Sequence, residues 1–599
     1  MCGFFAVFNN NKILNKKKIM ESSKLISHRG PDDSSNFLDN NFYGIFYRLS
    51  IQDLSLNGRQ PMLSKCKNYL ILFNGEIYNK DECRNKIANN LKGSSDTEVI
   101  LNLFLKYNIN FTKYIQGMYA ILIYDLNKKK IFLFRDPYGI KPVYYAINNN
   151  NIVISSEIKP ILNFIKKKSL NYKSTLDFFF KQQMDHWDNT FFEGVKALPP
   201  GNYLTYKKSV AVKKFANFPK QSMSDNQNLA EINLKKYFEE SIKKHLLSDV
   251  KISLMVSGGT DSNSLFKVIS KNLNYDPDCY TYFFKNYKSS EYYNLKKLKI
   301  KNIHEFEVTP NVIAKNINKV IEIVESPLTS IRQIADYEIY KMASKKNKVI
   351  LVGHGGDEIF AGYDQNIIRM IIKKGSIYKK INNLLKFINK RKKPKERQEY
   401  LTNIIMNLSY QNLSTKDCDS YFNIDLFNKD FLNSNLDEKY FKDKHFKNFD
   451  IVKKSQLRDI FEISLPRNLK YCDRLSMAHG LEARVPFLDL NFSNYSLNLN
   501  DNLKYKKDIS RWIFKKINKK LNLPKYKSSV PDPQSLWLKK YFFNDIYKTF
   551  KSIDEKKLNI FNKKELINYL KLYKKKKKFN SFLIFQIYSF CKFYEKFFN

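Results

Sequence analysis

The stretch KISLMVSGGTDS, residues 251–262, decides the fold of the larger part of the chain. Its first half, residues 251–256, is a short and nearly continuous apolar run, which is typical of a strand buried on both faces. A helix is expected from Asn263 to Leu273, so the two glycines stand between strand and helix. Glycines let the backbone approach a phosphate closely, and a helix N-terminus favours anions. The stretch therefore predicts a phosphate-binding turn at the end of a buried strand.

Polar side chains around this turn suit a nucleotide and its metal ion. Ser257 and Ser262 can donate hydroxyl groups, and Asp261 offers the oxygen ligand that Mg²⁺ prefers. No Gly-Lys-Ser/Thr follows, so the turn is not a Walker A loop. A second glycine-rich turn, GHGGDE at 353–358, also follows an apolar run. With CYTYFF at 279–284 as another strand, the alternation of strand, loop and helix predicts a doubly wound parallel sheet.

The first 215 residues follow a different pattern. Short apolar segments alternate there with Asn- or Lys-rich turns and predict antiparallel strands, with a helical stretch from Asp96 to Tyr107 between them. Residues 216–228 are polar and lack periodicity, so we predict a linker between domains 1–215 and 229–599. Residues 373–450 are rich in Lys and Asn and are expected to be helical or irregular.

The chain is strongly basic, with 104 Lys and Arg against 58 Asp and Glu, and a formal net charge of +46. Such a charge suits a nucleic acid or a membrane surface as partner. We prefer a bias in genomic base composition, because the lysines are spread along the whole chain and no nucleic-acid-binding motif accompanies them. We therefore predict that neither a nucleic acid nor a membrane is a partner.

The cysteines and apolar segments predict a cytoplasmic protein. Seven cysteines without a CxxC pair argue against a disulfide framework and against structural zinc. The N-terminus lacks the features of a signal peptide, and no stretch approaches the ~20 apolar residues of a membrane span. The aromatic run Phe579 to Phe598 follows Lys574 to Lys578 and fits either a membrane-surface helix or a terminal core helix. We prefer the core helix, because polar residues interrupt the run.

Cys2 carries the first hypothesis about chemistry. If Met1 is removed, the thiol and a free α-amine lie on one residue, and an amine with a pKa of about 7.7–8.0 can act as an internal base. Taken alone, a Cys at position 2 is more often an ordinary buried cysteine. The motifs that follow favour the nucleophile: HRGPD (28–32), YRLSI with Arg48, FNGEIYN with Asn74, Gly75 and Glu76, SDTE with Asp96, and FRDPYGIKPVYY with Arg135 and Asp136.

In this order the motifs resemble class II glutamine amidotransferases, the N-terminal-nucleophile (Ntn) hydrolases, which implies an αββα sandwich. The resemblance implies that Cys2 attacks the side-chain amide of L-glutamine. It also implies that the Asn74 side chain, a glutamine-binding group as well, and the Gly75 backbone N–H stabilise the oxyanion.

The same resemblance implies how the substrate is gripped. Arg48 would hold the α-carboxylate as a fork, and Glu76 and Asp96 would take the α-ammonium group. Two alternatives stay open for Arg135 and Asp136, which are either part of the site or an ion pair that stabilises the fold.

The turn SGGTDS resembles the pyrophosphate loop of ATP pyrophosphatases, usually written SGGxDS, which implies a Rossmann-like PP-loop domain that splits ATP into AMP and pyrophosphate. The segment from Gly353 to Tyr363 and the stretch DRLSMAHGLEARVPFLD (473–489) resemble asparagine synthetases. This implies Asp261 and Asp357 as Mg²⁺ ligands. The ATP-binding residues that it implies are Leu254, Val256, Ser257, Gly258, Gly259, Asp261, Ser262 and Gly353.

Two residues of this second site have alternative interpretations. Lys507, four residues before Arg511 on an expected helix, would neutralise the departing pyrophosphate, or it is a solvated surface lysine. His354 stands where asparagine-forming relatives usually carry Glu. It can take a proton from the attacking ammonia near neutral pH, but it can equally mark a different acceptor pocket or simply pack.

We predict a ligase that makes asparagine from L-aspartate, ATP and L-glutamine through an acyl-adenylate and internally channelled ammonia. ATP and Mg²⁺ are the expected cofactors, and a homodimer is a possible assembly. One alternative is the same chemistry on another carboxylate, such as a uronic sugar or an amino-acid derivative. Another is a non-catalytic basic binding protein on this scaffold.

Overall fold

The computed structural model describes residues 2–9, 11, 16–87, 91–148, 151–217, 226–287, 290–373, 376–391, 423–436, 440, 445–446, 448–518, 532–575 and 580–599. The predicted linker 216–228 lies mostly outside these residues, and so does much of the region 373–450. The described parts of that region include α13 (Ile377–Arg391) and α16 (Lys429–Asn435).

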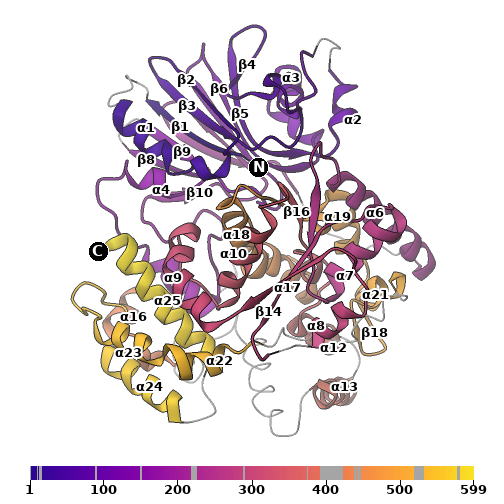
Figure 1. Cartoon of the computed structure of the whole chain (residues 1–599), viewed down its shortest axis with the longest axis vertical. Coiled ribbons are helices and arrows are strands. Elements are labelled where there is room, and N and C mark those ends of the chain that lie inside the picture. Colours follow the sequence, from indigo (N-terminus) through magenta and orange to yellow (C-terminus); the bar gives the residue numbers. More distant parts are fainter. Residues whose placement is uncertain are drawn as a thin grey trace.

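Two six-stranded antiparallel sheets form the N-terminal domain, drawn in indigo and purple in Figure 1. The first has the order β10-β8-β9-β1-β3-β2 and the second the order β12-β11-β7-β6-β5-β4. The strands are β1 (Gly3–Asn9), β2 (Asp33–Leu38), β3 (Phe42–Arg48), β4 (Met62–Leu63), β5 (Tyr69–Ile77), β6 (Gly117–Asp125), β7 (Lys130–Arg135), β8 (Tyr144–Asn148), β9 (Asn151–Ser155), β10 (Val195–Ala197), β11 (Asn202–Tyr206) and β12 (Val210–Lys214).

The side chains of these strands alternate between two cores. On β1, Phe4 and Phe8 belong to the core between the two sheets, whereas Phe5 and Val7 belong to the core that includes Ile19 of helix α1. Helices α1 (Lys16–Lys24) and α4 (Lys159–Leu162) thus cover the first sheet, and α2 (Lys80–Arg84) and α3 (Asp96–Tyr107) cover the second. This arrangement confirms the αββα sandwich.

The C-terminal domain is built on a five-stranded parallel sheet of order β15-β14-β13-β16-β17, which confirms the second predicted fold. The turn SGGTDS follows the central strand β13. Helix α7 begins at Thr260, three residues before the expected start at Asn263. The strands are β13 (Ile252–Met255), β14 (Cys279–Phe284), β15 (Ile303–Val308), β16 (Val349–Leu351) and β17 (Glu482–Arg484).

Helices surround this sheet and extend the domain (Figure 1). Those next to the sites and the domain boundary are α6 (Gln227–His245), α7 (Thr260–Lys267), α9 (Pro310–Val324), α10 (Arg332–Ala343), α11 (Gly356–Ile359), α17 (Ile451–Phe461), α18 (Ser464–Met477), α19 (Leu490–Asn498) and α21 (Trp512–Ile517). Further elements are α5 (Tyr172–Lys181), α8 (Ser290–Lys296), α12 (Asp364–Lys373), α20 (Asp501–Lys504), β18 (Tyr505–Lys506), β19 (Ile509–Ser510), α22 (Gln534–Trp537), α23 (Phe543–Lys551) and α24 (Lys563–Lys575).

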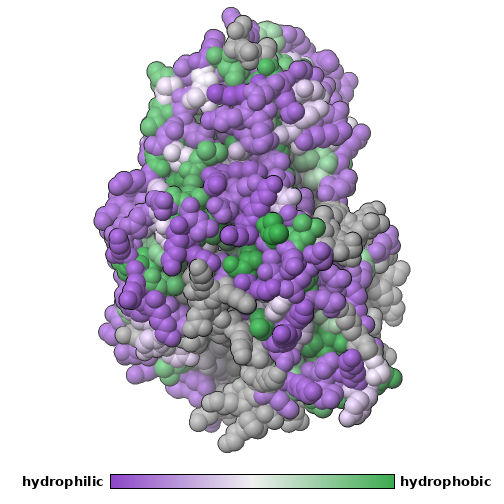
Figure 2. Space-filling model, turned by 90° about the vertical axis from the view of Figure 1, so that its right-hand side faces the viewer, coloured by the Kyte–Doolittle hydropathy of each residue, from purple (hydrophilic) through white to green (hydrophobic). Residues whose placement is uncertain are grey.

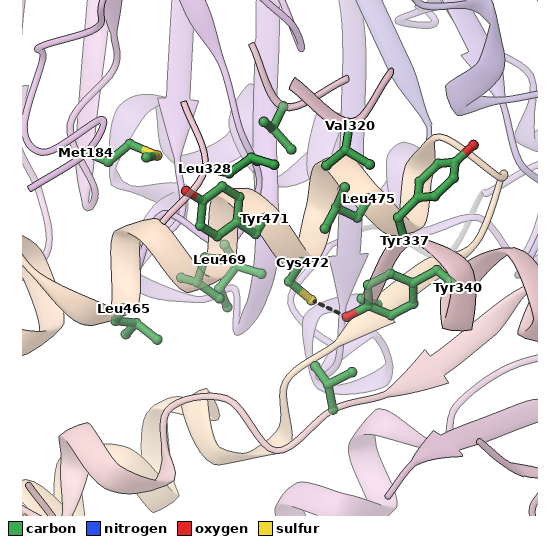
Figure 3. Packing of buried hydrophobic residues seen from close by; sticks show 14 of the residues in the cluster. Met184, Val320, Leu328, Tyr337, Tyr340, Leu465, Leu469, Tyr471, Cys472 and Leu475 are labelled. Carbon is green, nitrogen blue, oxygen red and sulfur yellow. Dashed lines mark hydrogen bonds between the residues drawn. The ribbon is translucent and has the colours of Figure 1, made fainter. Parts of the chain in front are cut away.

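Helix α18 joins the two domains through the largest hydrophobic core. Figure 3 shows its apolar residues against side chains of α9 and α10, with Met184 of the N-terminal part nearby, and the Tyr340 hydroxyl lies 3.5 Å from the Cys472 thiol. On the same helix, Asp473 and Arg474 form ion pairs with the N-terminal domain. Because both domains contribute to one core, the two predicted sites are fixed relative to each other.

The C-terminal helix α25 (Ser581–Phe598) belongs to this core, as preferred from the sequence. Phe590 and Phe593 are fully buried, and the Ser589 hydroxyl accepts a hydrogen bond from the Leu328 amide at 2.6 Å. Among the described residues, no helix combines the length and the apolar character needed to cross a membrane. On the face shown in Figure 2, hydrophilic residues cover most of the surface and hydrophobic residues form scattered patches.

Candidate active sites

A solvent-connected cavity opens beside the half-buried Cys2, where β3, β5 and β17 approach one another. Four residues expected from the sequence line it: Arg48, Gly75, Glu76 and Asp96. Residues that sequence reasoning did not single out also line it, and they include Gln52, Gln60, Thr97 and Glu482. Glu482 comes from the C-terminal domain, so both domains build this site.

The Cys2 thiol is held between strands, in surroundings that favour its protonated form. Its Sγ accepts a hydrogen bond from the Leu49 amide at 3.5 Å. Burial raises the pKa of the Cys2 thiol and Glu482 raises it further, while the Leu49 amide and Arg48 oppose this change. Because the thiolate is the nucleophile, the thiol needs a base in order to attack.

Asn74 supplies a donor that is ready for a substrate oxygen. Its Oδ1 accepts a hydrogen bond from the Cys2 amide at 3.2 Å. Its Nδ2 is buried and has no hydrogen-bond partner among the described residues. A side chain on Gly75 would come within 2.1 Å of the Met118 carbonyl oxygen, so only glycine fits beside it. A buried donor without a partner is costly, and a developing oxyanion would satisfy it.

Backbone oxygens hold Arg48 at the wall of the cavity. Its Nη1 donates to the Ser55 carbonyl oxygen at 2.8 Å, and Nη2 donates to the Asp53 carbonyl oxygen. A Cβ atom at Gly58 would lie 2.4 Å from Nη2, so this glycine makes room for the guanidinium. The arrangement fixes a positive charge in the cavity, as a ligand carboxylate requires.

Glu76 and Asp96 place two carboxyl groups in the same cavity. Burial raises the pKa of Glu76 well above its usual range, although Arg484 opposes this change. Burial also raises the pKa of Asp96 to about 6, while its hydrogen bond from the Ile77 amide opposes the rise. An ammonium group would favour the ionised form of both carboxyl groups.

Arg135 and Asp136 stabilise a turn and do not form an ion pair with each other in the described part of the chain. Arg135 donates to the carbonyl oxygens of Gly139, Lys141 and Leu198 at 2.7–2.9 Å. The Asp136 carboxylate accepts hydrogen bonds from the amides of Tyr119, Tyr138, Ile140 and Lys141. Of the two alternatives left open by the sequence, these contacts favour a role in stabilising the fold, although through backbone hydrogen bonds rather than an ion pair.

The turn after β13 brings together a left-handed glycine, two hydroxyl groups and the N-terminus of α7. Gly258 adopts a φ of +78°, a conformation that L side chains rarely adopt. The Ser262 hydroxyl accepts a hydrogen bond from the Ser257 amide at 3.1 Å and lies 3.3 Å from the Ser257 hydroxyl. The turn leads directly into the N-terminus of α7, whose first amides favour an anion.

Asp261 and Asp357 converge on one positive charge, the guanidinium of Arg511. Its Nη1 lies 2.5 Å from Asp261 Oδ1 and 3.3 Å from Asp357 Oδ1. Glycines create this space, because Cβ atoms at Gly356 and Gly362 would lie 2.4 and 2.5 Å from the two carboxylates. Two carboxylates around one point, completed by substrate phosphates, fit Mg²⁺.

His354 lies three residues before Asp357 in the chain. The structure shows that the predicted helical position of Lys507 is wrong. His354 follows β16, and burial lowers its pKa to about 4. Lys507 was expected on a helix, but it lies in the two-residue turn of the β18–β19 hairpin, with φ of +51° at Lys507 and +59° at Asp508. Two positive φ angles match a tight hairpin turn. The Lys507 side chain is exposed, whereas the Arg511 guanidinium contacts both aspartates.

Buried ion pairs connect the two domains close to Cys2. Arg29 donates to the Cys2 carbonyl oxygen at 3.2 Å and to both carboxylate oxygens of Asp473 on α18 at 2.9–3.1 Å. Arg474, the next residue, lies 3.0 Å from Glu157 and 2.8 Å from Glu325. The N-terminal residues therefore lie against the synthetase side of the molecule, as the position of the N label in Figure 1 indicates.

Comparison with known proteins identifies both halves. Residues 1–216 match the glutamine amidotransferase domain family, and residues 233–590 match the asparagine synthase family. Fold and sites thus define a ligase that combines a glutamine amidotransferase with an ATP-using synthetase. Because the second match covers more than half of the sequence, the chain belongs to the asparagine synthase family.

The relatives of the chain include asparagine synthetases and an amidase. The chain is 28% identical to asparagine synthetase (glutamine-hydrolyzing) 1 of Bacillus subtilis, over 90% of this chain and 88% of that protein. It is 27% identical to asparagine synthetase B (glutamine-hydrolyzing) of Escherichia coli, over 61% and 65% of the two chains. It is also 26% identical to amidase chry2 of Gibberella zeae, over 61% and 60%.

Proposed function

We propose that this enzyme amidates the side-chain carboxylate of L-aspartate to give asparagine, with L-glutamine as nitrogen donor and ATP as energy source. The observation that carries the amide-hydrolysing half is the buried, unpartnered Asn74 Nδ2 beside Cys2. The choice of aspartate rests on relatives named asparagine synthetase, one of which aligns with 90% of the chain.

In the first half-reaction, removal of Met1 gives Cys2 a free α-amine that accepts the thiol proton. The thiolate attacks the side-chain carbonyl carbon of glutamine, whose oxygen then receives hydrogen bonds from Asn74 Nδ2 and the Gly75 amide. The C–N bond breaks, ammonia leaves with the transferred proton, and a thioester remains. Water then hydrolyses the thioester to glutamate and regenerates the thiol.

In the second half-reaction, a carboxylate oxygen of the acceptor attacks the α-phosphorus of ATP. The bond to the β-phosphate oxygen breaks, and pyrophosphate leaves. Asp261 and Asp357 would hold Mg²⁺, which neutralises phosphate charge when bound. The SGGTDS turn and the N-terminus of α7 orient the phosphates. Leu254 lies near the end of β13, Val256 directly follows that strand, and Gly353 follows β16.

Ammonia then displaces AMP from the acyl-adenylate and forms the amide. An interior route suits this step, because water at neutral pH converts ammonia into ammonium, which is no nucleophile. Arg29, Asp473 and the core around α18 keep the two sites docked during the transfer. His354 would take a proton from the nitrogen as the amide forms.

A second candidate acceptor is a different carboxylate, such as a uronic sugar or an amino-acid derivative. The residue that favours it is His354, which stands at the position of a family glutamate. Two relatives of the chain are named amidases rather than asparagine synthetases.

Pyrophosphate release from ATP across a panel of acids, aspartate first, tests the proposal. Wild-type enzyme should release one pyrophosphate per amide formed with either glutamine or ammonium salts. If another acid outperforms aspartate, the second candidate replaces the first. Retention on heparin without any pyrophosphate release would instead support a basic binding protein.

A cytoplasmic location and a homodimer stay predictions, and light scattering during size-exclusion chromatography checks the assembly.

A further inference from the structure

The second domain contributes a buried arginine behind Glu76 and Glu482, two carboxyl groups that line the cavity beside Cys2. Arg484, the last residue of β17, is fully buried and uses every part of its guanidinium group. Its Nη2 donates to Glu76 Oε2 at 3.1 Å, and its Nε donates to Glu482 Oε1 at 2.6 Å. Its Nη1 donates to the carbonyl oxygens of His245, the last residue of α6, and of Leu247, two residues further on.

The charges around Arg484 explain what it does for Glu76. Three carboxyl groups, those of Glu76, Asp96 and Glu482, lie along this one cavity. Like charges at short range favour protonation, and a protonated Glu76 no longer attracts an ammonium group. The guanidinium of Arg484 counters this by favouring the ionised form of Glu76. Gln52 Nε2 binds the other oxygen, Glu76 Oε1, so the carboxylate is fixed at both ends.

The backbone of Arg484 belongs to the synthetase sheet. Arg484 is paired with Leu351 of β16, and its carbonyl oxygen accepts a hydrogen bond from the Val352 amide at 2.9 Å. Two residues after Val352, the chain reaches His354. Arg484 therefore contacts β16, the strand that leads to His354, through its backbone, and Glu76 through its side chain.

We propose, building on the proposed function, that Arg484 is a positioning residue for glutamine: it holds Glu76 for the substrate ammonium, so the glutamine site is complete only when the domains are docked. If Arg484 only binds the carbonyl oxygens at the end of α6, its substitution should affect substrates with and without an α-amino group equally. The two roles differ in their dependence on the α-amino group.

The test compares L-glutamine with 4-carbamoylbutanoate, which is glutamine without its α-amino group. For Arg484→Lys and Arg484→Gln in the full-length enzyme, we expect the KM for glutamine to rise about 10- to 100-fold, the range of a lost hydrogen bond to a charged group. The KM for 4-carbamoylbutanoate and the kcat for both should change less than about threefold. Lysine should restore part of the loss, because it keeps the charge.

Three controls separate the possible failures. Ammonia-dependent pyrophosphate release should stay at the wild-type level, which shows that the synthetase domain is folded. Arg467→Gln, a more exposed arginine on α18, should leave both KM values unchanged. Glu482→Asp moves the group that holds Arg484 Nε without changing charge and should cause a smaller selective rise, of about threefold. If the Arg484 variants do not fold, the KM values of the Glu482→Asp variant test the inference instead.

An equal rise in KM for both compounds, or no rise for either, overturns the inference. Wild-type enzyme that hydrolyses neither compound overturns the proposed function instead, so the two failures are distinguishable. A cycle with Glu76→Gln adds a second readout: Arg484→Gln should have no further effect on glutamine when Glu76 is already neutral.

Discussion

Arg511 forms an ion pair with Asp261 at 2.5 Å and thereby places its guanidinium between the carboxylates of Asp261 and Asp357. The same nitrogen lies 3.3 Å from Asp357. In the free protein, the arginine balances charges that would otherwise repel each other. A metal ion that binds both carboxylates has to share them with the guanidinium or displace it.

The Arg511 arrangement predicts a metal-dependent stability. Arg511→Gln should lower the free energy of unfolding by about 1–3 kcal/mol in metal-free buffer, because two partly exposed carboxylates lose their partner. Millimolar Mg²⁺ should restore the melting temperature of the variant and raise that of wild type less. Thermal unfolding with and without MgCl₂ measures this. Lys516→Gln, which loses Glu231 as partner, should show no such rescue. Equal responses of both variants to Mg²⁺ would contradict the metal site.

The glutamine site should depend on pH in a defined direction. Asp96 has a pKa of about 6 and the pKa of Glu76 is raised, so both carboxyl groups gain protons as the pH falls. Protonation removes the charge that attracts the substrate ammonium. The KM for glutamine should therefore rise below pH about 6, approaching tenfold per pH unit, while that for 4-carbamoylbutanoate stays flat. Steady-state glutaminase assays between pH 5 and 8 check this, and Asp96→Asn should weaken binding but remove one titration step.

Asn74 is expected to act on kcat rather than on KM. Asn74→Ala removes an oxyanion donor, which should lower the glutaminase kcat about 10²- to 10³-fold. Ammonia-dependent pyrophosphate release serves as the internal control and should not change. A loss of both activities would indicate a structural role for Asn74.

The residues that sequence could predict are those that act through local motifs. Asn74, Gly75 and Glu76 lie consecutively on β5, and Ser257 to Ser262 are consecutive residues of the turn and the first turn of α7, so short sequence motifs identify them. Arg484 and Arg511 were missed as site residues, because their partners are Glu76 and Asp261, 408 and 250 residues away in the chain. Lys507 was placed wrongly on a helix, since its spacing from Arg511 also fits a short hairpin that ends at a helix.

The proposed nucleophile, Cys2, should be required for glutamine use alone. Cys2→Ala should abolish glutamine-dependent synthesis and leave ammonia-dependent synthesis intact, because the synthetase site does not use the thiol. Intact mass spectrometry of active enzyme should show the loss of Met1. Active enzyme that retains Met1 would mean that the α-amine of Cys2 is not the base.

His354 should separate activation of the acceptor from amide formation. His354 follows β16 and is uncharged at neutral pH, so it can accept a proton as ammonia attacks the adenylate. His354→Gln should leave pyrophosphate release nearly unchanged but lower the amide formed per pyrophosphate, since the adenylate is then lost to water. His354→Glu should restore the ratio, because a carboxylate also accepts a proton. Amide and pyrophosphate are measured in the same reaction with saturating ammonium. A His354→Gln variant that still forms one amide per pyrophosphate would show that His354 only packs against its neighbours.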